Sequence, residues 1–209
     1  MKGFIYKDLC LLGSVWKSYA FIFVMFLALT VTGVYDVSFL FMMVSVILCM
    51  YPSSSFSYDE LAKWDRFAVS VPNGRVKVVR AKYGFALLLG AFSLVMGLLL
   101  SLPAAFLGRM ELSEGLLTCV GGAAGALLIN AILLPLLFRF GAQKGRILLI
   151  AVVAALAGVL GALLAIGGMT AFGSGLLESF VLVVLPVLTL LALFISYRIS
   201  LGIYQKKEF

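Results

Sequence analysis

The sequence contains no histidine and little charge: only 12% of its 209 residues are acidic or basic. The absence of histidine excludes Ser–His and Cys–His nucleophile pairs, histidine ligands for zinc or haem, and histidine proton relays. Soluble globular domains carry about 25% charged residues. A hydrophobic content of 64% is too high for a chain of this size to bury in water, because small domains leave much of their surface exposed. The composition therefore predicts an integral membrane protein.

Cysteine is also scarce, and Cys10, Cys49 and Cys119 show no CxxC pairing. This spacing argues against a disulfide framework or a zinc site, so we interpret all three as small buried hydrophobic residues. The 21 glycines form neither a GxxxxGK[ST] loop nor a GxGxxG turn after a strand, which are the motifs that cradle nucleotide phosphates. We expect no metal or cofactor to be bound by this chain itself.

The apolar residues are gathered into six intervals without charge. In a bilayer core each span must satisfy its own backbone, and a helix needs about 20 apolar residues to cross. The strict alternation of a membrane β-barrel is missing. We predict an all-α integral membrane fold with six transmembrane helices, at about residues 19–35, 38–53, 83–106, 116–138, 147–168 and 179–199. The glycine-rich remainder from Gly168 to Leu177 is expected at the outer surface.

The basic residues are distributed unevenly about these spans. Fifteen of the sixteen fall in residues 1–18, 54–82, 139–146 and 198–209, whereas only Arg109 falls on the other side. The positive-inside rule then predicts that both termini are cytoplasmic. Contact with anionic lipid head groups accounts for the net charge of +7, so no binding of nucleic acid is expected. We predict one transmembrane domain over residues 1–209 of a multi-pass plasma-membrane protein.

The N-terminal segment is amphipathic. Ile5, Leu9, Leu12 and Trp16 recur at helical spacing between polar residues. This pattern predicts a helix over residues 3–17 that lies in the cytoplasmic membrane interface before the chain enters the bilayer.

The largest polar segment is the loop 54–82 between the second and third spans. Ser57 followed by Glu60 matches a capping box, and Pro72-Asn73-Gly74 is a helix-breaking sequence. We predict a short cytoplasmic helix over residues 57–70.

This short helix combines acids with aromatic residues. A helix lying on anionic lipid should avoid the carboxylates of Asp59, Glu60 and Asp65. Aromatic residues such as Trp64 are frequent in protein–protein hot spots. We therefore favour docking to another protein over contact with lipid alone.

No ionisable residue maps to the predicted bilayer centre, so an ion or proton path is not indicated. Asn130 is the most polar deep residue. We favour an interhelical hydrogen bond over direct substrate contact for it, and we keep Asn130, Thr30 and Ser93 as weak candidates for a substrate path. Because nothing here predicts catalysis, energy must be supplied from elsewhere, with the cytoplasmic helix as the point of entry.

These features together resemble the type-2 export family of ATP-binding-cassette permeases. The likeness covers essentially the whole chain and is strongest to the Gram-positive branch of phenol-soluble modulin exporter permeases. It rests on Lys7-Asp8 and on three motifs: Asp59-Glu60…Trp64…Ser70-x-Pro72-x-x-Arg75…Lys82-Tyr83, Leu134-Pro135…Phe138-Arg139-Phe140-Gly141…Lys144-Gly145-Arg146, and Ser196…Ser200…Tyr204-x-Lys206-Lys207-Glu208-Phe209.

The resemblance implies a bacterial plasma-membrane permease subunit that is not itself an enzyme. The 57–70 helix would be a coupling helix docked on a separate ATPase subunit, which binds ATP and Mg²⁺. Two permease copies, as a homodimer, would form the path over two ATPases and export amphipathic or hydrophobic peptides. The coupling residues would be Asp59, Glu60, Trp64, Asp65, Arg66, Phe67, Pro72 and Arg75.

A second hypothesis also fits a membrane bundle with a cytoplasmic partner. The chain could be an energy-independent substrate-capture component, or a membrane scaffold. A capture component needs a polar pocket near the outer face, where this sequence has few polar residues, and we therefore prefer the exporter.

Overall fold

The structure, a computed structural model, describes residues 2–106, 108, 111–165 and 180–207. Almost all of these residues are helical, and no strand occurs among them, which confirms the predicted all-α fold for the described part of the chain. The elements are α1 (Lys2–Val31), α2 (Val37–Leu61), α3 (Trp64–Ser70), α4 (Gly74–Phe106), α5 (Leu112–Phe140), α6 (Ala142–Ala165), a π-helical segment η1 (Phe180–Val184) and α8 (Leu185–Lys206).

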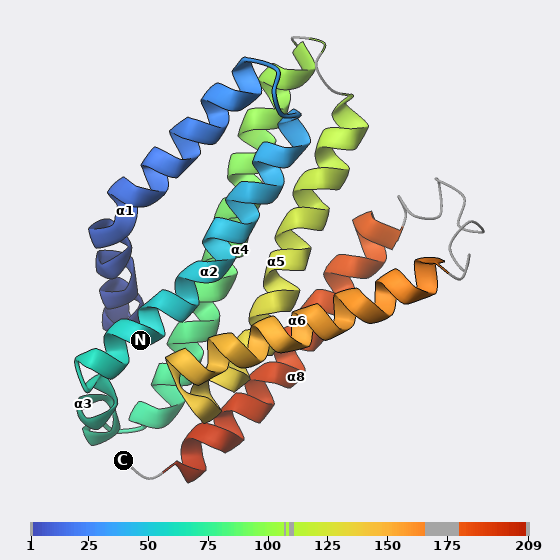
Figure 1. Cartoon of the computed structure of the whole chain (residues 1–209). Helices are drawn as coiled ribbons and strands as arrows, with labels where there is room; N and C mark the ends of the chain where they lie inside the picture. Colours follow the sequence, from blue (N-terminus) through green and yellow to red (C-terminus); the bar gives the residue numbers. More distant parts are fainter. Residues whose placement is uncertain (1, 107, 109–110, 166–179, 208–209) are drawn as a thin grey trace.

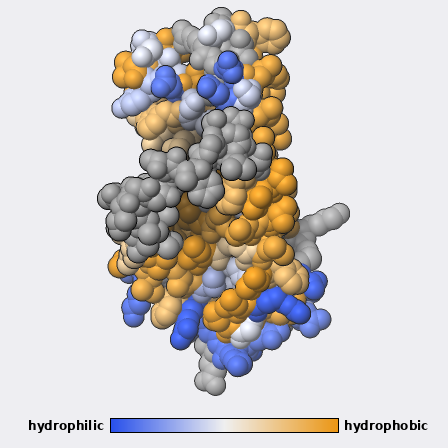
Figure 2. All heavy atoms as spheres, turned by 90° about the vertical axis from the view of Figure 1, so that its right-hand side faces the viewer, coloured by the Kyte–Doolittle hydropathy of each residue, from blue (hydrophilic) through white to orange (hydrophobic). Residues whose placement is uncertain are grey.

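The long helices form one bundle around α5. In Figure 1, α2 and α4 lie on one side of α5, and α6 and α8 lie on the other. The first turns of α1, the short α3 and the last turns of α8 meet at the lower end of this view. Figure 2 shows hydrophobic residues across the middle of the molecule and hydrophilic residues at both ends, as expected for a bundle that spans a bilayer.

Four described spans are long and apolar enough to cross a membrane: α2, α4, α5, and η1 together with α8. The two parts of α1, which meet at an angle of 57° between Gly13 and Trp16, would make a fifth. The structure thus supports four or five spans, compared with the six predicted. Helix α6 overlaps the predicted span 147–168, whose last residues lie outside the described part, as does the predicted surface segment 168–177.

The principal core is built on the second half of α5. Leu134 and Phe138 are fully buried there. The Phe138 ring meets Phe56 of α2 edge-on at 4.9 Å between centroids, and meets Tyr204 of α8 at 5.2 Å. Aromatic pairs of this geometry add about 0.5–1.5 kcal/mol to the burial of their area. One α5 side chain therefore joins three helices near the charged end of the bundle.

The first half of α5 packs through small residues. A Cβ added to Gly122 would lie 3.0 Å from Ser45 Oγ of α2. One added to Gly97 of α4 would lie 2.7 Å from Cys119 Sγ of α5. At these distances an added methyl group would have to displace its neighbour, so small residues let the helices approach closely.

Helix α2 does not end where the sequence predicted. It continues through Pro52 and the serine run to Leu61, so the single helix predicted over 57–70 is wrong. The chain breaks instead at Lys63, whose φ of 50° is left-handed, and α3 begins at Trp64. Pro52 is tolerated inside the helix because membrane helices satisfy freed backbone groups with neighbouring helices and serine side chains.

The predicted capping box is also wrong. Ser57 lies inside α2, and its hydroxyl donates to the Ser53 carbonyl oxygen at 3.2 Å. The carboxylate of Glu60 accepts a hydrogen bond from the backbone N–H of Ala142 at 2.7 Å. Glu60 therefore caps the start of α6, where a negative charge also suits the helix dipole.

The turn from α3 to α4 depends on Gly74. A Cβ at this position would overlap the backbone carbonyl oxygen of Ala68, and Asn73 before it has a positive φ of 56°. The close approach of the two backbones fixes how α3 folds back against α4.

We expect Gly74→Ala to destabilise the protein by about 1–3 kcal/mol, because the added methyl overpacks a site bounded by backbone. The measurement is the thermal unfolding temperature of the detergent-purified protein. Gly84→Ala is the matched control, since its Cβ would meet only Ile5 Cδ1 at an ordinary 3.8 Å. Equal unfolding temperatures for the two variants would contradict the requirement for glycine at Gly74.

Candidate functional site: the charged end of the bundle

The segment predicted to couple to a partner lies where most elements meet. The end of α2, all of α3 and the start of α4 adjoin the first turns of α1 and the last turns of α8 (Figure 1). The α5–α6 junction also reaches this end through the bond between Ala142 and Glu60.

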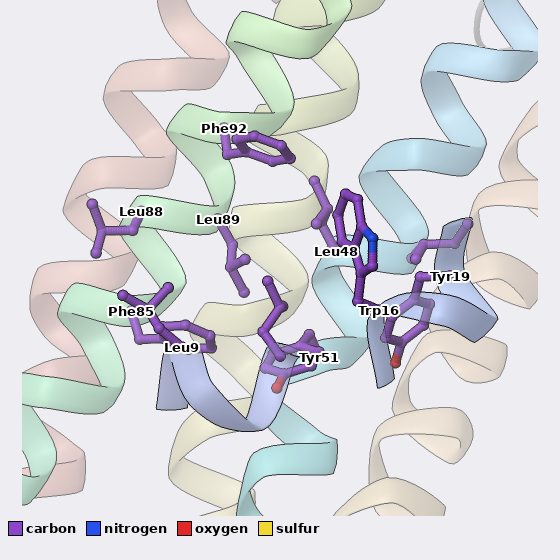
Figure 3. Close-up of a pocket in the computed structure, with 11 residues that line it drawn as sticks. Leu9, Trp16, Tyr19, Leu48, Tyr51, Phe85, Leu88, Leu89 and Phe92 are labelled. Carbon is purple, nitrogen blue, oxygen red and sulfur yellow. The ribbon is translucent and has the colours of Figure 1, made fainter. Parts of the chain in front are cut away.

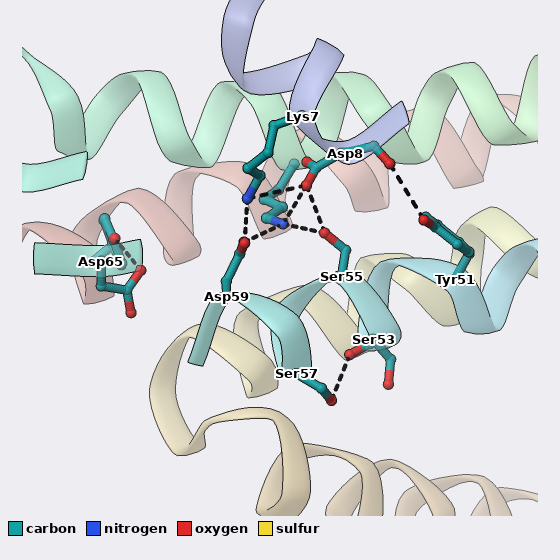
Figure 4. Close-up of polar contacts among 10 residues, drawn as sticks. Lys7, Asp8, Tyr51, Ser53, Ser55, Ser57, Asp59 and Asp65 are labelled. Carbon is teal, nitrogen blue, oxygen red and sulfur yellow. Dashed lines mark hydrogen bonds and ion pairs between the residues drawn. The ribbon is translucent and has the colours of Figure 1, made fainter. Parts of the chain in front are cut away.

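Four charged side chains form a buried ionic cluster at this end: Lys7 and Asp8 of α1, Asp59 of α2 and Lys82 of α4. Lys82 Nζ lies 3.0 Å from Asp8 Oδ1 and 2.6 Å from Asp59 Oδ2. Lys7 Nζ pairs with Asp59 and lies 3.3 Å from Asp8 Oδ1. In Figure 4, Lys7 and Asp8 face Asp59 and Ser55. Two lysines and two aspartates balance the formal charge of the cluster.

Hydrogen bonds complete the ionic cluster. Ser55 Oγ donates to Asp8 Oδ1 at 2.7 Å and accepts from Lys82 Nζ at 2.6 Å, and the Tyr51 hydroxyl donates to the Asp8 carbonyl oxygen at 3.4 Å. Asp8 is 1% exposed and Lys82 is 3% exposed. Such deeply buried charges are tolerated only when they are paired and hydrogen-bonded. Each lysine and each aspartate here contacts both charges of opposite sign.

Sequence reasoning did not find the ionic cluster. It named Asp8 and Lys82 only as motif residues of the family resemblance, and it assigned Asp59 to docking. The contacting residues are 52 and 74 positions apart in the chain, so no local pattern links them. The one available signal was an acid at position 8 in a helix predicted to lie on anionic lipid.

The other predicted coupling acids are also used inside the protein. Glu60 caps α6, and Asp65 accepts a 2.8 Å hydrogen bond from the Tyr204 hydroxyl of α8. Arg75 Nη1 donates to the Gln205 carbonyl oxygen. These contacts tie α3 and the start of α4 to the end of α8.

Trp64, the first residue of α3, is only partly buried and packs against α1. Its ring contacts Phe4 edge-on at 6.1 Å and Phe67 at 5.0 Å, while Lys7 Nζ sits 4.7 Å from the ring centroid. Cation–π contact of this kind stabilises by about 0.5–2 kcal/mol. The predicted docking tryptophan therefore also holds α1 against α3.

The residues left on the outside of this end form an exposed patch that we call the docking face. Leu61 is 82% exposed and Phe67 is 58% exposed, and apolar patches rimmed by polar residues mark sites of protein or membrane interaction. Pro72 is exposed beyond the end of α3. Of the predicted coupling residues, Arg66 and Phe67 belong to the docking face. The docking face comprises Tyr58, Leu61, Lys63, Arg66 and Phe67.

The three candidates for a substrate path are not brought together. Thr30 donates to the Phe26 carbonyl oxygen within α1, at the opposite end of the bundle. Ser93 and Asn130 both line a small cavity of about 10 Å³ between α2, α4 and α5. There Ser93 Oγ lies 2.9 Å from Ser45 Oγ.

Asn130 makes the interhelical contact that the sequence analysis favoured. Its Nδ2 donates to the Ala126 carbonyl oxygen at 3.0 Å and to Cys49 Sγ of α2 at 3.4 Å. Its Oδ1 is buried and has no hydrogen-bond partner among the described residues. The described residues also contain no group of three or more acids or cysteines gathered for a metal ion.

Removing one member of the ionic cluster should cost far more stability than removing an exposed lysine. We expect Lys82→Ala to lower the free energy of unfolding by about 3–5 kcal/mol, because it leaves two carboxylates with only Lys7 to neutralise them and so one uncompensated charge in the cluster. Lys144→Ala, at an exposed position near the same end, should have almost no effect. Thermal unfolding of the two variants in one detergent checks this difference, and similar curves would contradict the ionic cluster.

Comparison with known proteins gives one result that covers the chain. A family model described as "ABC-2 family transporter protein" matches residues 3–205. No curated protein and no solved structure matches. Permeases of this family are typically non-catalytic membrane subunits and generally work with an ATPase subunit. Because the match spans nearly the whole chain, this multi-pass membrane protein belongs to the ABC-2 family of transporter proteins.

Proposed function

We propose that the chain is the permease subunit of an ATP-driven exporter and that the docking face receives a separate ATPase subunit. The observation that carries the proposal is the exposure of Leu61 and Phe67, with Lys63 and Arg66 exposed in the same segment, at the end of α2 and on α3. The ionic cluster holds the end of α2 through Asp59. Interface hot spots combine aromatic and arginine side chains in this way.

The acids of the same segment support the proposal indirectly. Asp59 forms ion pairs with α1 and α4. Glu60 accepts a hydrogen bond from α6, and Asp65 accepts one from α8. A displacement of α3 or of the end of α2 is therefore resisted by the four helices that these carboxylates contact. A partner that moves the docking face would thus move the bundle, which is what coupling of ATP closure to transport requires.

The remaining parts of the proposal follow the family. The charged end would be cytoplasmic by the positive-inside rule. ATP and Mg²⁺ would be bound by two ATPase copies, and two permease copies would form the path as a homodimer. The proposed cargo is an amphipathic or hydrophobic peptide, because the described bundle has an apolar interior and offers hydroxyls and one amide rather than buried charges near its centre.

The docking face is tested by co-purification with an ATP-binding-cassette ATPase subunit that is co-expressed with the chain. We expect the double variant Leu61→Ala, Phe67→Ala to lose most of the ATPase. Each truncated hot-spot side chain costs about 2 kcal/mol or more, which corresponds to about 30-fold in Kd. The double variant should still fold, because both side chains are exposed.

Leu191→Ala is the matched control, since Leu191 is also a largely exposed leucine but lies on α8 away from the docking face. Unchanged retention of the ATPase by the double variant would show that the docking face is elsewhere. Failure of the wild-type chain to retain any ATPase would instead favour a capture component or scaffold.

A further inference from the structure

An apolar groove of about 390 Å³ lies between the bend of α1 and helices α2 and α4. Figure 3 shows Leu9 and Trp16 of α1 across from Leu48 of α2 and Leu89 of α4. The groove is large enough for a ligand, because small-molecule sites have volumes of about 300–1,000 Å³. It is separate from the docking face, and it shares Leu48 and Leu89 with the small cavity beside Asn130.

The groove offers almost nothing to a polar ligand. Its floor is a buried cluster of Tyr51, Phe85 and Leu89, which is distinct from the main core. The hydroxyl of Tyr51 is already bonded to the Asp8 carbonyl oxygen. The remaining lining is mostly aliphatic and aromatic carbon. A hydrocarbon chain is therefore the chemistry that the groove matches.

The groove is also open to its surroundings. Trp16 is 57% exposed, and Leu88 and Phe92 on α4 are nearly half exposed. In a bilayer, acyl chains lie against such apolar side chains. The buried floor and three helical walls would enclose one chain more fully than the open surface of the bundle does.

A cation is the next residue in the chain after Trp16, which lines the groove. This residue, Lys17, has an exposed side chain, and no acidic side chain of the described residues pairs with it. Tryptophan is enriched at membrane interfaces, and lysine is enriched in the cytoplasmic segments beside them. Lysine near the membrane surface attracts anionic head groups by about 1 kcal/mol.

We propose that the groove binds one acyl chain of an anionic phospholipid whose phosphate pairs with Lys17. The chain would fill the inside of the bend in α1. The first turns of α1 would then be supported from both sides, by the ionic cluster through Lys7 and Asp8 and by lipid through Leu9 and Leu12.

The two tryptophans of the chain make a direct test practical, because Trp16 lines the groove and Trp64 does not. The Trp64→Phe variant leaves Trp16 as the only tryptophan. It is reconstituted in vesicles of unlabelled phosphatidylcholine. A small fixed fraction of the lipid carries brominated chains, and this brominated lipid is phosphatidylglycerol in one sample and phosphatidylcholine in the other. Bromine quenches tryptophan fluorescence on contact. We expect about fivefold higher apparent affinity for the brominated phosphatidylglycerol, which is 1 kcal/mol expressed as a binding ratio.

Two further variants in the Trp64→Phe background separate the contribution of the lipid's acyl chain to binding from that of its head group. Lys17→Gln should remove the preference for phosphatidylglycerol while leaving residual quenching by both lipids. Leu48→Phe should reduce quenching by both, because it fills the groove, whereas Leu191→Phe on the exposed side of α8 should not. Retention of the full preference in Lys17→Gln would overturn the assignment of the phosphate partner.

Three other outcomes would overturn the lipid site itself. Equal quenching by the two brominated lipids in Trp64→Phe would mean that the groove holds no particular lipid. A Trp16 emission that depends on the protein-to-lipid ratio and not on head group would mean that a second copy covers the groove. Relief of quenching by a stoichiometric amphipathic peptide would assign the groove to cargo. None of these readouts requires the ATPase, so they are independent of the proposed coupling.

Discussion

The arrangement of this protein depends on the pairing of four charges in a largely buried place, where Asp8 and Lys82 are almost fully enclosed. Lys7, Asp8, Asp59 and Lys82 come from three helices, and each would be strongly unfavourable there alone. Their mutual neutralisation requires that α1, α2 and α4 meet in one particular register. Hydrophobic packing between membrane helices is less directional, because lipid is as apolar as the helices themselves. The ionic cluster therefore supplies specificity that the apolar surfaces do not.

Other contacts extend this constraint to the rest of the bundle. Glu60 at the end of α2 is hydrogen-bonded to the start of α6, and Asp65 of α3 is hydrogen-bonded to Tyr204 of α8. Phe138 on α5 packs against both α2 and α8. The short helix α3 thus lies at the end of the bundle where these contacts between helices are concentrated. A displacement of its exposed side would therefore be transmitted to the neighbouring helices.

The sequence predicted the helices well and the contacts poorly, for one physical reason. Apolar intervals are local, and a bilayer requires each to satisfy its own backbone as a helix, so α5 at Leu112–Phe140 contains the predicted 116–138. The capping box failed because Glu60 has a better partner 82 positions away. Asp8 and Lys82 meet across 74 positions. Arg66 and Phe67 were predicted to face a partner, and both are exposed. Asp59, Glu60 and Asp65 were assigned to the same role because carboxylates should avoid anionic lipid, but they are bonded within the chain.

The unpaired oxygen of Asn130 has a consequence for the energy of this packing. A buried acceptor that lacks a donor costs about 1–3 kcal/mol, and Oδ1 has none among the described residues. It lies between α2, α4 and α5, where a small relative shift changes which groups it faces. An arrangement that gave this oxygen a donor would gain that amount relative to the present one. The cost of this oxygen thus falls on the packing of α2, α4 and α5 at the centre of the bundle, whereas every charge of the ionic cluster has its partners.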